Sequence, residues 1–354
     1  MFEWFYILFI RKRLLEGVII VKPTIKDVAQ KANVSIATVS RILNNEKGYG
    51  EETRKKVLSV IRELGYQPNA VARGLINKKT QSIGVVFPYV SNMYSGEVLS
   101  GIEEAAYKSD FSVVICNTDG QQERTLRNLK MLAEKQVDCI IFVSEMVSEE
   151  TAKFLLNTSI PVLLISTKSE MYPLPYIKTD DQFAAFSAVN YLIQSGHRDI
   201  AMLAGPISDP IAGSTRIKGY TQALTSAGFP VKEENIIKVN GFSFEDGLEG
   251  YEILKNVKSQ CTAVFAASDE IALGVISAAY QNHVSIPEEL SIIGYDNLKL
   301  AEMAVPPLTT VAQPLKEMGK MAVEMLCDHI QSGKELNSII MPHKIVERQS
   351  VKRY

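Results

Sequence analysis

The stretch from Thr24 to Leu43 constrains the fold most, because its pattern fits two short helices joined by a tight turn. Thr24 is a suitable N-cap, and Asp27 three residues later can complete a capping box. Apolar residues then recur at the spacing of one buried helical stripe. Asn33 tolerates the left-handed backbone that a sharp helix end needs, and Ser35 can cap the second helix. The residues of the second helix that are expected to face inward are Val39, Ile42 and Leu43.

The opposite face of this second helix is small and polar at its start and carries an arginine one turn later. Ile36 and Ala37 could contact thymine methyl groups, and Arg41 could bond to a guanine edge or a phosphate. This chemistry predicts a helix that enters a DNA major groove. The candidate DNA contacts on this stretch are Thr24, Ser35, Ile36, Ala37, Thr38, Arg41 and Asn44. The alternative is a helical hairpin that only caps a larger domain.

Three further features favour DNA binding over a simple cap. Glu51 to Leu64 predicts a third helix that ends at Gly65, which is enough for a small helical domain. Residues 22–79 hold 12 lysines and arginines against 5 acidic residues, a net charge of +7 in a chain whose total is −2. Such a cationic segment suits a polyanionic partner. Pro68 to Leu75 predicts a very short helix whose apolar side needs a partner copy or a DNA groove to cover it.

After a polar linker, INKKTQ, the pattern changes to buried strands that alternate with helices. The first strands are IGVVFP, FSVVIC, CIIFVS and IPVLLIS, and the helical stretches between them include GEVLSGIEEAAYKS and ERTLRNLKMLAEKQ. Continuous apolar strands separated by helices imply a parallel sheet that is covered on both faces. The cycle begins again near Asp180, which predicts a second lobe of the same kind.

Several classes of protein are disfavoured by the composition. The four cysteines and four histidines lack disulfide-like or metal-like spacing, so we expect a reducing cytoplasm and no metal. An apolar run near the N-terminus precedes its basic residues and is too short to span a membrane. We expect residues 1–21 to be an extension or a misassigned start, and a membrane-surface anchor is the weaker alternative. The absence of GxSxG, Walker and GxGxxG patterns argues against an enzyme or a nucleotide cofactor.

The segments TIKDVAQKANVSIATVSRILNN, EETRKKV, ELGYQPNAVARGL and SIGVVFP resemble, in this order, the lactose-repressor family of bacterial transcription regulators. The resemblance runs from about Thr24 to about Ser350. It implies an all-α helix-turn-helix headpiece over residues 22–67, a hinge helix and linker over 68–81, and a two-lobed α/β sensor like a periplasmic binding protein over 82–354. It also implies that Leu75, beside Ala72 and Arg73, wedges into the minor groove at the centre of a palindromic operator.

The resemblance further implies a first lobe of about residues 82–180 plus 312–337 and a second lobe of about 181–311 plus 338–350. A ligand between them would contact the carboxyl ends of strands. The family positions that contact the effector correspond to Tyr94, Ser95, Ser166, Arg216, Phe242, Ser268, Asp269 and Asp296. Structural roles remain the alternative, in which Arg216 pairs with an acid at a helix start, Asp296 caps a loop and Phe242 belongs to the core.

The chain is therefore expected to be a sequence-specific transcription regulator, a repressor of a carbohydrate-utilisation operon. Its expected partners are a palindromic double-stranded DNA operator and a sugar or sugar derivative that acts as effector. Because no leucine heptads follow VERQS, we expect a homodimer. Two alternatives stay open. One is control by a phosphorylated corepressor protein, as in the catabolite-control branch of the family, and the other is a sugar-binding protein without a transcriptional role.

Overall fold

The computed structural model describes residues 23–43, 46–66, 80–257 and 261–354. The chain divides into two compact units, Met1–Thr80 and Gln81–Tyr354, which are described separately below. The expected N-terminal extension, Asn44 and nearly all of the expected hinge lie outside the described residues.

The described part of the N-terminal unit consists of α2 (Ile25–Ala32), α3 (Ile36–Leu43) and α4 (Glu51–Leu64). The amide and hydroxyl of Thr24 donate to Asp27 Oδ2 at 2.7 and 2.8 Å, so the predicted capping box forms. Asn33 takes the left-handed conformation, with φ 53°, as predicted for the tight turn. The three helices bury one small core, made of Val28, Ala29, Ala32, Val39, Ile42, Val57 and Val60.

The first lobe of the C-terminal unit is built on a six-stranded parallel sheet in the order β11-β5-β4-β3-β1-β2. Its strands are β1 (Ser82–Phe87), β2 (Ser112–Asn117), β3 (Cys139–Val143), β4 (Val162–Ile165), β5 (Tyr176–Thr179) and β11 (Ile339–Met341). Neighbouring residues of β1 point to opposite faces, so Val85 belongs to one buried core and Val86 to another. Both faces of the sheet are therefore covered.

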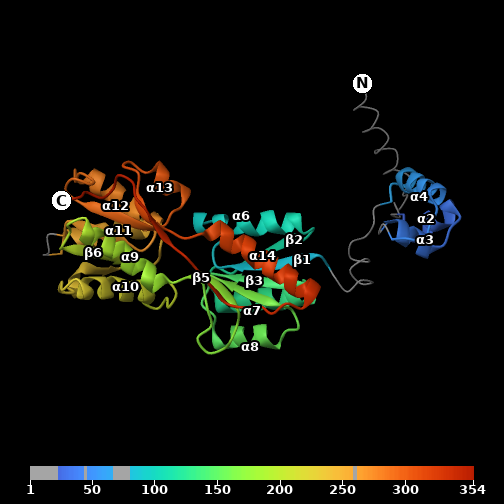
Figure 1. Ribbon diagram of the computed structural model, residues 1–354, viewed down its shortest axis with the longest axis horizontal. Coiled ribbons are helices and arrows are strands. Elements are labelled where there is room, and N and C mark those ends of the chain that lie inside the picture. Colours follow the sequence, from blue (N-terminus) through green and yellow to red (C-terminus); the bar gives the residue numbers. More distant parts are fainter. Residues whose placement is uncertain (1–22, 44–45, 67–79, 258–260) are drawn as a thin grey trace, which may run out of the picture. The chain divides into compact units, whose positions relative to one another are not determined.

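Four helices provide that cover. They are α6 (Met93–Lys108), α7 (Gln122–Glu134), α8 (Glu149–Asn157) and α14 (Leu315–Ser332). Figure 1 shows α6 beside α14 on one side of the sheet and α7 with α8 on the other. The α6–α14 contact is unusually close, because a Cβ atom on Gly101 would lie 1.9 Å from the backbone oxygen of Lys316. Only glycine fits at this crossing.

The second lobe repeats the arrangement, with the strand order β12-β10-β9-β8-β6-β7. Its strands are β6 (Ile200–Ala204), β7 (Ile236–Lys238), β8 (Ala263–Ala266), β9 (Ser291–Asp296), β10 (Thr309–Ala312) and β12 (Lys344–Val346). Its helices include α9 (Asp181–Gln194), α10 (Gly213–Ser226), α11 (Phe244–Lys255), α12 (Asp269–Gln281) and α13 (Lys299–Met303). The sheet is parallel apart from the edge pair β10–β12, which is antiparallel and departs from the expected pattern.

The chain passes between the lobes after β5, after β10 and after β11. The expected lobe boundary at residue 338 is wrong by a few residues, because Ile339–Met341 pairs with Ile177–Thr179 of the first lobe. Strand β5 would otherwise expose one row of backbone hydrogen-bonding groups, and β11 satisfies them before the chain returns to the second lobe.

Candidate functional site

Helix α3 presents to solvent the face that is predicted to contact DNA bases. Ile36 is 45 % exposed, and Ala37 and Arg41 are exposed as well, while Val39 on the opposite side is fully buried. The Ser35 hydroxyl accepts a hydrogen bond from the Thr38 amide at 3.0 Å and so caps the N-terminus of the helix. The outward residues are thus held on a helix whose other side is anchored in the core.

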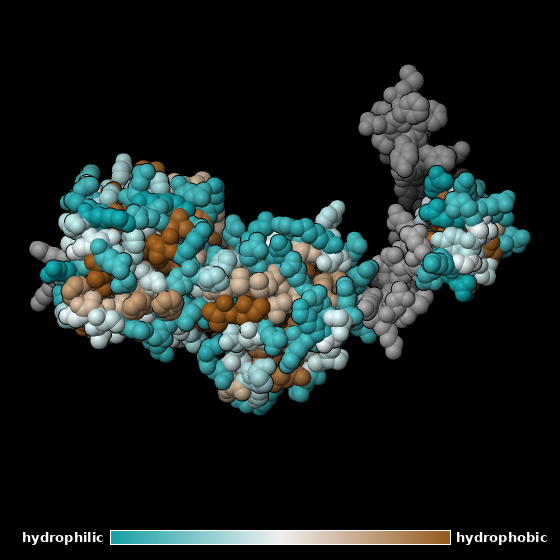
Figure 2. Space-filling model, in the orientation of Figure 1, coloured by the Kyte–Doolittle hydropathy of each residue, from teal (hydrophilic) through white to brown (hydrophobic). Residues whose placement is uncertain are grey.

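The rest of the N-terminal unit supports that helix. Thr24 commits its hydroxyl proton to Asp27, so its role in the structure is that of a helix cap. An exposed ion pair of 2.6 Å between Lys31 and Glu63 connects α2 with α4. Figure 2 shows that the visible surface of this unit is largely hydrophilic. The candidates Asn44, Ala72, Arg73 and Leu75 lie outside the described residues.

A cavity of about 640 Å³ lies between the two lobes of the C-terminal unit. Loops at the carboxyl ends of strands from both lobes line it, which is where open parallel sheets bind ligands. The structure brings six of the eight predicted effector residues to its wall, namely Tyr94, Ser166, Arg216, Phe242, Ser268 and Asp296.

Arg216, on the first turn of α10, is held on three sides. Its Nε and Nη2 donate to Asp181 Oδ1 at 3.3 and 3.0 Å, and its Nη1 donates to the carbonyl of Ala267. The guanidinium carbon lies 3.6 Å from the centroid of the Tyr295 ring. Burial opposes the charged form of Arg216, but Tyr295, Asp181 and Asp296 outweigh it and raise its pKa. The guanidinium is therefore a fixed cation in the cavity wall.

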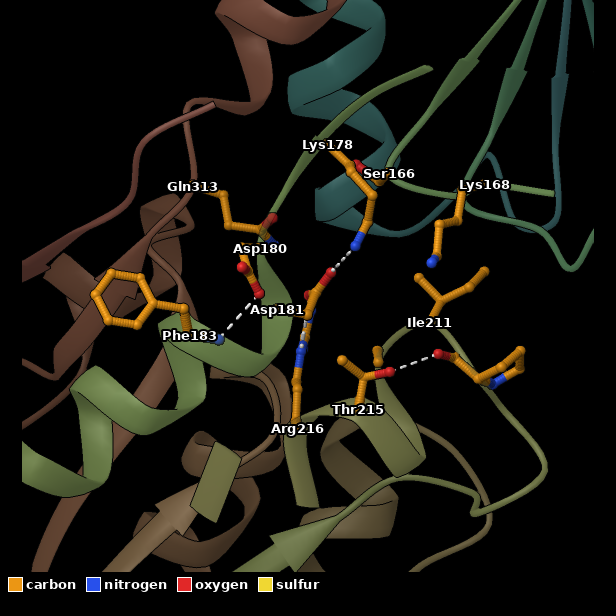
Figure 3. A network of polar contacts seen from close by, with 12 residues as sticks. Ser166, Lys168, Lys178, Asp180, Asp181, Phe183, Ile211, Thr215, Arg216 and Gln313 are labelled. Carbon is orange, nitrogen blue, oxygen red and sulfur yellow. Dashed lines mark hydrogen bonds and ion pairs between the residues drawn. The ribbon is translucent and has the colours of Figure 1, made fainter. Parts of the chain in front are cut away.

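Asp181 also forms an ion pair with Lys178 of the first lobe. Lys178 Nζ, at the end of β5, lies 3.1 Å from Asp181 Oδ2, and all three charged side chains are buried. Figure 3 shows Lys178 and Arg216 approaching Asp181 from opposite sides. Asp181 is the first residue of α9. Arg216 therefore pairs with an acid at a helix start, as the structural alternative expected, and it also lines the cavity.

Asp296 ends β9 with φ 114°, a backbone conformation that non-glycine residues rarely adopt. Gln313, on the second crossover between the lobes, donates from Nε2 to Asp296 Oδ1 at 2.8 Å. Burial raises the pKa of Asp296 to about 7, although Arg216 and Gln313 oppose the rise. A carboxyl group in this state can accept or donate a hydrogen bond near neutral pH.

The other predicted contacts form two walls of the cavity. Burial raises the pKa of Tyr94, and Ser166 opposes the rise. Ser268 caps α12 through the Ile271 amide and donates to the carbonyl of Phe242 at 2.8 Å. The Phe242 ring covers Gly205, where a Cβ atom would lie 2.2 Å from the ring. Ser268 therefore positions an aromatic ring against the cavity.

Two predicted effector residues do not line the cavity. Ser95 is buried in the first turn of α6, where its amide donates to the capping Asn92. Asp269 is fully buried and accepts bonds from the Thr310 hydroxyl at 2.5 Å and the Leu298 amide at 2.7 Å. Both residues belong to the scaffold. The residues next to them in the chain, Tyr94 beside Ser95 and Ser268 beside Asp269, line the cavity instead.

Sequence reasoning missed most of the acidic wall. Six carboxyl groups and one guanidinium line the cavity, the acids being Glu145, Asp181, Asp209, Asp246, Glu270 and Asp296. Gln313 follows β10 directly and Asp181 comes two residues after β5, and those positions were usable signals. Among the described residues, no group of three or more histidine, cysteine or acidic side chains has a metal-binding arrangement.

The sequence matches two family models. Residues 24–69 match the bacterial regulatory proteins of the lacI family, and residues 189–351 match a periplasmic binding protein-like domain. Catabolite control protein A of Priestia megaterium is 41 % identical over 93 % of this chain and 99 % of that protein. The chain belongs to the lacI family. The transcriptional repressor PurR of Vibrio parahaemolyticus, 35 % identical over 93 % of this chain and 99 % of that protein, is another relative of this lacI-family chain.

Solved structures agree with this assignment. The lac repressor dimer bound to operator and an anti-inducer has a TM-score of 0.85 and 26 % identity, and it covers 94 % of this chain and 100 % of that one. A complex of the regulator CelR with cellobiose has a TM-score of 0.71 and 27 % identity, covering 93 % and 99 %. The lacI-family chain is thus a DNA-binding transcription regulator of the repressor type, in a family made up of regulators. No helix in its described part is both long and apolar enough to cross a bilayer.

Proposed function

We propose that this repressor binds a neutral carbohydrate in the cavity between its lobes, and that the bound sugar changes its affinity for operator DNA. The observation that carries the proposal is the charge of the wall, in which six carboxyl groups face one guanidinium. That guanidinium is already bonded to Asp181 and Ala267. An anionic effector would therefore meet mostly like charge.

A sugar suits the same wall for chemical reasons. Carboxylate oxygens accept hydrogen bonds from hydroxyl groups, and Asp296 lies at the cavity with one oxygen bonded to Gln313. Phe242 offers an apolar surface to the C–H face of a ring, and Ser268 fixes its backbone. Ligand sites of this kind combine apolar walls with a few placed polar groups.

The link to DNA is proposed to run through the segments that cross between the lobes. A ligand changes an equilibrium only by its different affinity for the two states. Lys178–Asp181 lies at the first crossover and Asp296–Gln313 at the second, so a sugar that bonds to these oxygens favours one lobe arrangement over the other. In a homodimer, that choice would set the spacing of two headpieces on a palindromic operator and the position of Leu75 in its minor groove.

The test is thermal unfolding of the full chain against neutral monosaccharides and disaccharides, sugar phosphates and nucleobases. A ligand at about 100 times its dissociation constant adds about 2.7 kcal/mol of stability. We expect a neutral sugar to raise the midpoint and to change operator affinity in a gel-shift titration. Tighter binding of a sugar phosphate, or no shift with any sugar, would contradict the proposal. In the second case, control by a phosphorylated partner protein becomes the leading alternative.

A further inference from the structure

One acidic residue of the cavity is buried and has only hydroxyl groups as printed partners of its carboxylate. Glu145, in the loop between β3 and α8, is 9 % exposed and lines the cavity. The Thr118 hydroxyl donates to one carboxylate oxygen at 2.7 Å, and the Thr125 hydroxyl donates to the other. In the part of the chain that the structure describes, no lysine, arginine or histidine pairs with it.

A buried carboxyl group with only hydroxyl partners is costly for a protein to maintain. Burial raises the pKa of Glu145, and the two threonines only partly oppose this. A carboxylate has about four lone-pair positions, so two remain after the threonine bonds. The two threonine contacts do not by themselves require a charged group, because a glutamine could accept from one hydroxyl and donate to the other. The two remaining lone-pair positions of the carboxylate are available to hydrogen-bond donors of a ligand.

Glu145 belongs to the first lobe, whereas the cluster around Arg216 belongs to the second. Glu145 lies in the loop after β3, while Arg216 is on α10 and Asp296 ends β9. The ion pairs of Arg216 and Lys178 go to Asp181 and not to Glu145. The one cavity therefore carries two separate polar centres, and each can hold its own part of a ligand.

The surroundings of Glu145 suit a hydroxylated ring. The first-lobe part of the cavity wall around it comes from the loops after β2 and β3 and from the first turns of α7 and α8. Its residues are small, polar or flexible: Gly120, Gln122, Ser144, Met146, Ser148 and Thr151. The Ser148 hydroxyl caps α8, and Met146 is 59 % exposed and presents an apolar side chain at the wall. Hydroxyl acceptors beside an apolar face repeat the chemistry that Asp296 and Phe242 provide in the second lobe.

We propose that the first-lobe arm of the cavity, centred on Glu145, is a second subsite that binds a second sugar unit of the effector. This inference rests on the proposed function and narrows the effector to a disaccharide or a larger glycoside. Hydroxyl groups of the distal unit donate to the free positions of Glu145, while the first unit contacts Asp296, Phe242 and Arg216. A cavity of about 640 Å³ lies within the range that encloses drug-sized ligands.

The experiment is calorimetric titration of the full chain with a panel of disaccharides, their constituent monosaccharides and glucosamine. The variant is Glu145→Gln, which keeps the shape of the side chain, an acceptor for one threonine hydroxyl and a donor to the other. The matched control is Glu149→Gln, an exposed acid at the start of α8 that pairs only with Lys153 among the described residues. We expect the wild-type chain to bind one disaccharide at least about tenfold more tightly than either of its monosaccharides.

Glu145→Gln is expected to weaken binding of that disaccharide about tenfold and to leave monosaccharide affinity within about twofold, because hydrogen bonds to charged groups exceed those to neutral ones. Glu149→Gln should change neither. Equal wild-type affinities for disaccharide and monosaccharide would overturn the subsite while the proposed function stands, and that comparison needs no variant. Preference for glucosamine over every disaccharide would assign Glu145 to an ammonium group and also overturn it. If no sugar binds, both proposals fail.

Discussion

The buried carboxyl group of Asp296 should make the stability of the C-terminal unit depend on pH, and one substitution should remove that dependence. Burial raises its pKa from 3.8 to about 7. Between these values the folded protein keeps a proton that the unfolded chain has lost. The folded state therefore binds more protons, and stability must fall as pH rises through this window.

The size of the effect follows from the two pKa values. One unit of difference corresponds to about 1.4 kcal/mol. For a group that titrates near 3.8 when unfolded and near 7 when folded, the loss between about pH 5 and about pH 8 is about 2.5 kcal/mol. Asp296→Asn removes this term and retains an acceptor for the Gln313 amide.

The assay is urea unfolding of the full chain, followed by far-ultraviolet circular dichroism at the two pH values. Wild-type protein should lose about 2.5 kcal/mol more than Asp296→Asn on going to the higher pH. Glu145 and Glu270, whose pKa values burial also raises, titrate in both proteins and cancel in the comparison. Asp110→Asn, at an exposed turn, controls for the loss of one negative charge. Equal pH dependence in wild type and Asp296→Asn would refute the reasoning.

Three further outcomes are expected. Gly101→Ala should lower stability by about 1–3 kcal/mol in urea unfolding, because its Cβ would meet the Lys316 backbone; Gly96→Ala, at an open position on the same helix, is the control. Arg216→Ala should cost about 3 kcal/mol, since it leaves the buried Asp181 with only Lys178 and the Tyr295 hydroxyl as side-chain partners among the described residues. It should also abolish the sugar-induced rise in midpoint; a retained rise would show that the cavity assignment is misplaced. Leu75→Ala should weaken operator binding in gel shifts and leave the dimer intact in sedimentation; unchanged operator affinity would remove the hinge hypothesis.

The headpiece was predictable because its signals are local. Thr24, Asp27 and Asn33 determine helix ends within a few residues, and the helical spacing of apolar residues identifies the buried side. The strands of both lobes were predictable for a similar reason, since a strand buried on both faces must be apolar throughout.

The sequence by itself determined the elements, the family and six of the residues at the cavity wall. Only the tertiary structure decided how their charges are paired. Asp181 joins Lys178 of one lobe to Arg216 of the other, and Asp269 turns away from the cavity while Ser268 faces it. The return strand Ile339–Met341 likewise joins the first sheet. These outcomes depend on contacts between segments far apart in the chain, and local propensity and spacing carry no record of such contacts.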